Sequence, residues 1–150
     1  MRNNIEAYLQ GSLEVLENLK KDENIKNKIL ELVNNIFNVI QKGNKILIVG
    51  NGGSAADAQH LAAEFVVRYQ KNRIPLPALA LTTDTSVLTA TGNDYSFEDI
   101  FARQIDAFGN KGDILILFST SGQSKNIIKA SKIAKQKNLK NVLLTGSKKF

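Results

Sequence analysis

Two side chains that could move a proton lie four residues apart in this 150-residue chain. His60, the single histidine of the sequence, is followed by Glu64, and an i, i+4 spacing places both on one face of a helix. A carboxylate with a raised pKa can remove a proton from a carbon beside a carbonyl, and an imidazole with a carboxylate can help to hold zinc. A zinc site normally takes three or four protein ligands, and the sequence has no second histidine and no cysteine. The pair indicates proton-transfer or metal chemistry but completes neither.

Two loops rich in glycine and serine each follow a predicted strand and precede a predicted helix. Residues 50–54 are Gly-Asn-Gly-Gly-Ser, and residues 119–124 are Ser-Thr-Ser-Gly-Gln-Ser. Such loops direct backbone N–H groups, small hydroxyls and the positive end of a helix dipole to one point, which suits a phosphate. Serine and glycine also favour caps and turns on local grounds. Two such loops beside a helix face that carries His60 and Glu64 nevertheless predict that a phosphorylated small molecule binds between the loops.

The first loop has two competing interpretations. Gly50-x-Gly52-x-x-Ala55 fits the dinucleotide fingerprint, and Asp84 follows the second predicted strand, where a ribose-binding acid would lie. A lone glycine fingerprint is weak evidence, and the loop lacks the Gly-Lys-Ser/Thr ending of a P-loop. Ser54 with Asp57 also forms a Ser-x-x-Asp capping box, so Ser54 could simply cap the helix that follows.

Other polar residues near these motifs have ordinary structural interpretations. Thr82, Thr83 and Asp84 are expected to form a strand end and a turn. Arg68, expected late on the His60 helix, could reach a substrate phosphate, and a solvated arginine is an equally good interpretation.

Composition favours one globular cytoplasmic domain. The chain is 43% hydrophobic and has no cysteine, which is compatible with a reducing compartment. Residues 1–6 are polar where a secretory signal would be apolar, and no apolar run approaches the roughly 20 residues of a membrane span. The net charge is +6, but the lysines are scattered and not interleaved with aromatic residues. We therefore expect solvated helix faces and no direct contact with nucleic acid.

The elements that must position these groups alternate along the chain. Residues 1–43 are expected to form N-terminal helices, since apolar side chains recur every three or four residues from Ile25 to Ile40. Residues 44–150 alternate short apolar runs with helical stretches, and the predicted strands are 45–49, 78–81, 113–118 and 141–144. Continuous apolar runs indicate strands covered on both faces. The predicted fold is a doubly wound α/β domain with a largely parallel sheet and a helical N-terminal extension.

Three segments together resemble the phosphoheptose isomerase family of the sugar-isomerase (SIS) domain superfamily. They are the run from Asn51 to Glu64, Gly92-Asn93-Asp94, and residues 119–124. The resemblance extends over essentially the whole chain, and the long first segment is specific. The resemblance implies substrate contacts from Asn51, Gly52, Gly53, Ser54 and Glu64, phosphate contacts from Ser119, Thr120, Ser121 and Ser124, and sugar-hydroxyl contacts from Asn93 and Asp94.

The same resemblance implies a reaction and its partners. His60 and Glu64 are expected to bind zinc, and Glu64 to act as the acid/base that moves a proton between C1 and C2 through an enediol. The substrates would be sedoheptulose 7-phosphate and D-glycero-D-manno-heptose 7-phosphate, used for heptose in bacterial surface polysaccharides. A homotetramer with shared sites is implied as well.

The resemblance implies that the family continues beyond Phe150 with a strand and a long helix, whose glutamine and histidine complete the zinc site. The chain is therefore expected to be C-terminally incomplete and to expose one face of its sheet. Two alternatives remain open beside the isomerase. One is a sugar-phosphate sensor without turnover. The other is an adaptor that binds a replication initiator protein.

Overall fold

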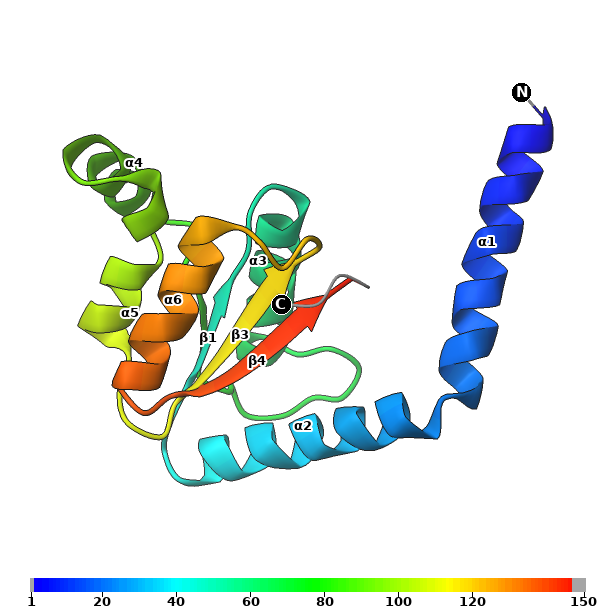
Figure 1. Cartoon of the computed structure of the whole chain (residues 1–150). Helices are drawn as coiled ribbons and strands as arrows, with labels where there is room; N and C mark the ends of the chain where they lie inside the picture. The colour runs from blue at the N-terminus through cyan, green and yellow to red at the C-terminus, as the bar shows by residue number, and fades with distance from the viewer. Residues whose placement is uncertain (1, 147–150) are drawn as a thin grey trace. The chain divides into compact units, whose positions relative to one another are not determined.

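The computed structural model of the protein describes residues 2–146, with side chains from Asn4 onward (Figure 1). The chain divides between Asn35 and Ile36 into two compact units. Within the described residues, no helix has both the length and the apolar character needed to cross a bilayer.

The N-terminal segment forms two helices, as the apolar spacing predicts. α1 covers Arg2–Lys21 and α2 covers Glu23–Gln41. Asp22 separates them and caps α2, because its Oδ1 accepts the Ile25 N–H at 3.0 Å. The end of α2 leads into Gly43, whose φ of 76° lies in the left-handed region that suits glycine after a helix.

The rest of the chain folds around a four-stranded parallel sheet, which confirms the predicted fold class. The strands are β1 (Ile46–Val49), β2 (Ala78–Ala80), β3 (Ile114–Ser119) and β4 (Lys140–Thr145). Their order in the sheet is β2-β1-β3-β4, and every pairing is parallel. Each predicted strand is present, with its ends within one residue of the predicted ones.

Helices cover both faces of this sheet (Figure 1). The remaining elements are α3 (Gly53–Val66), α4 (Thr85–Asp94), the 3-10 turn η1 (Phe97–Asp99), α5 (Ala102–Phe108) and α6 (Lys125–Gln136). Side chains on one face of β1 and β3, including Leu47 and Leu115, join Ile105 and Ile127 in one buried cluster under α5 and α6. Ile48 and Ile116 alternate with them and are buried toward α3 on the other face. The two central strands are apolar on both sides, as continuous apolar runs require.

A buried carboxylate fixes the amino ends of the two central strands. Asp113 is 1% exposed and accepts three hydrogen bonds: from the Lys45 ammonium at 2.6 Å, the Lys45 N–H at 3.0 Å and the Asn110 N–H at 2.8 Å. A charge buried this deeply is tolerated because its partners replace water. The bonds hold β1 and β3 in one register, which also fixes how their carboxyl ends meet.

Candidate active site

The two glycine- and serine-rich loops lie side by side at the carboxyl edge of the sheet. β1 and β3 are neighbours, with Val49 paired to Leu117, and each strand leads directly into one loop. From β1 the chain continues through α3 to β2 on one side, and from β3 it continues through α6 to β4 on the other. The connections therefore diverge between these strands, and such a switch point is where open α/β sheets bind ligands.

The first loop depends on close backbone approach. A Cβ on Gly50 would lie 2.4 Å from the Ser54 carbonyl oxygen, so any larger residue would force α3 away from β1. Gly52 occupies the N-cap position of α3 with φ 57°, and Gly53 is the first helical residue. Ser54 therefore lies within the first turn, and the predicted Ser-x-x-Asp capping box is wrong. The chain reaches helical geometry two residues earlier because glycine adopts the positive φ.

The second loop is held by its own hydroxyl groups. Ser119 is buried, and its Oγ accepts the Gly122 N–H at 3.1 Å, while Ser121 Oγ accepts the Gln123 N–H at 3.1 Å. A hydroxyl that accepts a backbone N–H keeps its own hydrogen for another acceptor. Ser124 occupies the N-cap position of α6, yet its side chain makes no capping hydrogen bond. These hydroxyls can donate to a phosphate at the positive end of α6.

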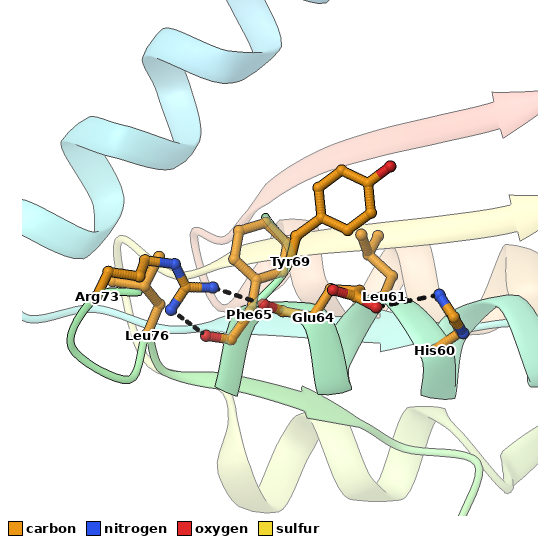
Figure 2. Close-up of a pocket in the computed structure, with 7 residues that line it drawn as sticks. All are labelled: His60, Leu61, Glu64, Phe65, Tyr69, Arg73 and Leu76. Atoms are coloured by element: carbon orange, nitrogen blue, oxygen red, sulfur yellow. Dashed lines mark hydrogen bonds and ion pairs between the residues drawn. The ribbon is translucent and has the colours of Figure 1, made fainter. Parts of the chain in front are cut away.

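His60 and Glu64 do lie on one face of α3, as their spacing predicts. His60 Nε2 is 3.3 Å from Glu64 Oε1 (Figure 2). The His60 side chain is 78% exposed and that of Glu64 is 28% exposed. Glu64 Oε2 is buried and has no hydrogen-bond partner. Buried carboxylate oxygens are normally satisfied, so this atom is available to a substrate proton or a cation.

The donor types of this pair fit zinc, which takes imidazole nitrogen and carboxylate oxygen. The partnerless Oε2 of Glu64 supports the same assignment. Across residues 2–146, however, no group of three or more histidine, cysteine or acidic side chains could hold a metal ion. His60 and Glu64 therefore fit as two of the three or four protein ligands that a zinc site normally takes.

A hollow of about 370 Å³ adjoins the pair, and Figure 2 shows its lining. Arg73, which sequence reasoning missed, closes one end of it. The Arg73 guanidinium donates to the Glu64 carbonyl at 2.5 Å and to the Phe65 carbonyl at 2.7 Å. These are carbonyls of the last turn of α3, which have no partner within the helix. A basic residue near a helix end is the only sequence signal for such a contact, and the separation of eight or nine positions between the partners obscures it.

Arg68 is exposed and lies beyond the end of α3 at Val66. Its predicted place on the His60 helix is wrong, because the helix ends where Arg73 and the Leu76 N–H bind its carbonyls.

The other predicted residues lie around this edge of the sheet. Ser54, Ser119 and Thr120 share a hollow of about 250 Å³. Asn51 and Ser124 line another of about 510 Å³. Asn93 and Asp94 are exposed at the end of α4, where the Asn93 amide donates to the Asp94 carboxylate at 2.8 Å.

Asp84 has a structural role. Its Oδ1 accepts the Val87 N–H at 3.0 Å and caps α4. This confirms the turn interpretation and removes the acidic residue on which the dinucleotide alternative depended.

Comparison with known proteins identifies the family. Residues 7–146 match the model of the SIS domain family. The chain is 51% identical to a phosphoheptose isomerase from Aneurinibacillus thermoaerophilus, over 98% of this chain and 74% of that protein. It is 50% identical to phosphoheptose isomerase 2 from Campylobacter jejuni, over 96% of this chain and 74% of that protein.

Solved structures agree with this identification. A phosphoheptose isomerase from Francisella tularensis superposes with a TM-score of 0.91 at 36% identity, over 97% of this chain and 75% of that one. The Neisseria gonorrhoeae phosphoheptose isomerase superposes with a TM-score of 0.87 at 39% identity, over 96% of this chain and 74% of that one. The fold, the loops and the His60/Glu64 face thus occur together in a chain that belongs to the phosphoheptose isomerase family of SIS-domain proteins.

Proposed function

We propose that the protein is an aldose-ketose isomerase that interconverts sedoheptulose 7-phosphate and D-glycero-D-manno-heptose 7-phosphate. The observation that carries this proposal is the partnerless, buried Oε2 of Glu64, on the helix that begins at one of the two phosphate-type loops. A free carboxylate oxygen beside a sugar-phosphate site is what proton removal next to a carbonyl requires. The family names of the relatives support the same substrate class.

In this proposal the loops bind and Glu64 transfers the proton. The hydroxyls of Ser119, Thr120, Ser121 and Ser124 hold the phosphate, and Asn51, Gly52, Gly53, Ser54, Asn93 and Asp94 orient the sugar. Glu64 removes a proton from C1 of the ketose, and the C–H electron pair forms the C1–C2 double bond of an enediol while the carbonyl oxygen gains a proton. Return of a proton to C2, with loss of the C1 hydroxyl proton, produces the aldose.

We further propose that His60 and Glu64 hold zinc. When bound, the ion would supply Lewis-acid stabilisation of the negative charge that develops on the enediol oxygens. His60 contributes an imidazole from the exposed side of α3, and its 3.3 Å approach to Glu64 keeps the two donors together. A zinc site normally takes three or four protein ligands, so the proposal requires further donors beside His60 and Glu64.

A homotetramer is proposed on the basis of α1 and α2. Large apolar side chains are exposed along both helices of the N-terminal unit, among them Ile5, Leu9, Leu13, Leu16, Ile29 and Val33. Their helical spacing makes continuous apolar stripes, which monomeric proteins rarely expose. Light scattering should report an oligomer for the native chain and a smaller species for a variant with Leu9→Glu and Leu13→Glu.

A cytoplasmic location, and a role in supplying heptose for bacterial surface polysaccharides, complete the proposal. A phosphorylated metabolite as substrate and a chain without cysteine are compatible with that compartment.

The test is conversion of sedoheptulose 7-phosphate by the purified chain, with and without zinc, beside Glu64→Gln. Glu17→Gln on α1 is the matched control for loss of one carboxylate. We expect Glu64→Gln to lower turnover by about 10²- to 10⁴-fold and Glu17→Gln to preserve it. Full turnover in Glu64→Gln would contradict the proposal. Binding of the sugar phosphate without turnover by the unmodified chain would instead support the sensor alternative.

A further inference from the structure

Asn126 joins the two substrate loops through a reciprocal amide pair. The Asn51 side-chain N–H donates to Asn126 Oδ1 at 2.9 Å, and the Asn126 N–H donates to Asn51 Oδ1 at 2.8 Å. Asn51 belongs to the loop after β1, whereas Asn126 lies in the first turn of α6 directly after the loop that follows β3. The two residues are 75 positions apart in the chain. Within residues 4–146, no other hydrogen bond between side chains links these two loop regions.

The burial of Asn126 shows that this pair is a fixed part of the structure. Asn126 is 2% exposed, and its Oδ1 also accepts the Ile127 N–H at 2.9 Å. The same oxygen therefore holds the start of α6 and the first loop. Removing a partner from a buried amide leaves polar atoms without water or protein contacts, so the arrangement resists change.

The pair lies against the hollow that two predicted substrate residues share. Asn51, Ser124 and Asn126 line this space of about 510 Å³ together with Phe97, Glu98 and Lys125. A change in the distance between the two loops would change the width of this hollow directly. The amide pair, which forms part of the lining of the hollow, sets the distance between the two loops.

The pair also limits what Asn51 can offer to a substrate. An asparagine amide has two N–H donors and two acceptor lone pairs. One donor and one lone pair of Asn51 are already used by Asn126. Half of its hydrogen-bonding capacity thus serves the protein, and the orientation of the remainder is fixed by Asn126.

We propose that Asn126 is a positioning residue that sets the spacing of the two loops, and that Asn51 contributes to substrate affinity largely through this pair. The proposal rests on the sugar-phosphate isomerase function argued above. It extends that function to Asn126, a buried residue that lines the proposed substrate cavity. The loop motifs of the sequence do not indicate this residue.

A double-mutant cycle tests the proposal in the full chain. Asn51→Ala, Asn126→Ala and the double variant are compared for KM and kcat with sedoheptulose 7-phosphate. Loss of two neutral hydrogen bonds that organise the site should raise KM by roughly 5- to 20-fold in each single variant. We expect kcat to change less than KM, and the double variant to match the single ones, because both substitutions remove one shared interaction. Multiplicative effects in the double variant would overturn the proposal.

A matched control separates positioning from simple destabilisation. Asn141 is a second amide that ties α6 to the sheet, since its Nδ2 donates to the Ser131 carbonyl at 2.8 Å, and it lies on β4. Asn141→Ala should lower the melting temperature and leave KM unchanged. If Asn126→Ala also lowered only the melting temperature, Asn126 would be structural alone and the proposal would be wrong.

Two further measurements keep the test independent of folding and turnover. Asn126→Asp keeps the shape and the acceptor for Ile127 but removes the donor to Asn51, so it should raise KM even if Asn126→Ala fails to fold. Thermal protection by sedoheptulose 7-phosphate reports binding without chemistry. Protection that weakens equally in Asn51→Ala and Asn126→Asp supports the amide pair, and unchanged protection in Asn126→Asp contradicts it. Absence of both turnover and protection in the unmodified chain would refute the isomerase function instead.

Discussion

The loop region and the His60/Glu64 region differ in how far the chain satisfies its own polar groups. In the loops, Ser119, Ser121 and Asn51 all have partners within the protein. On α3, one Glu64 oxygen is buried without a partner, and His60 is largely exposed. The loops are therefore preorganised before a ligand arrives, whereas the pair on α3 gains its remaining contact only from a ligand. Binding and proton transfer should separate when each region is altered in turn.

The largest effect is expected at Glu64. Glu64→Gln keeps the shape of the side chain and removes the base, so kcat should fall by about 10²- to 10⁴-fold. Thermal protection by sedoheptulose 7-phosphate should be retained because the loops are intact. A parallel loss of protection would mean that the two regions do not act separately.

Removal of Arg73 should disturb the pair without touching the loops. Arg73→Met removes two charge-assisted bonds to the last turn of α3, which should lower the free energy of unfolding by about 1.5–3 kcal/mol. Because Glu64 belongs to that turn, kcat should fall as well. Arg68→Met, an exposed control beyond the helix, should stay within about 0.5 kcal/mol of the native protein. Denaturant unfolding measures both variants, and equal stability would show that Arg73 does not hold the helix end.

Changes in the second loop should affect binding more than chemistry. Ser119→Ala removes the acceptor of the Gly122 N–H and the proposed donor to phosphate. This is a loss of about 1 kcal/mol, so KM should rise by roughly 5-fold with a smaller change in kcat. Ser12→Ala on α1, where the hydroxyl bonds only the Tyr8 carbonyl, is the control. A fall in kcat at unchanged KM would show that Ser119 contributes to the chemical step, which would contradict the separation of binding from proton transfer.

The smallest effect concerns the turn beside the loops. The hydrogen bond from Lys129, and then that from Ser96, lower the pKa of Asp99 below its ordinary value. A carboxyl group whose pKa is lowered in the folded state stabilises the protein at pH values above its pKa in the unfolded state. This stability is lost as the pH falls through the pKa of the folded state. Lys129→Met should raise the Asp99 pKa toward its ordinary range, as an NMR titration can show, with KM unchanged. An unshifted pKa would show that the ion pair does not form in solution.

The sequence predicted most of the framework and part of the site. Buried strands reveal themselves through continuous apolar runs, so all four were placed correctly, and the i, i+4 spacing placed His60 beside Glu64. Ser54 was misplaced as a cap because the positive φ of Gly52 is a property of the folded backbone. Arg73 and Asn126 were missed because their partners are distant in sequence or are backbone atoms, and no local pattern encodes such contacts.

Proton removal by Glu64 can be measured directly through hydrogen exchange at C1 of sedoheptulose 7-phosphate in D₂O. Exchange requires only the first proton transfer and not the complete isomerisation, so it isolates the role assigned to Glu64. We predict that NMR will show deuterium at C1 with the native protein, supplied with zinc, and none above background with Glu64→Gln. Equal incorporation by both proteins would contradict the assignment of Glu64 as the base.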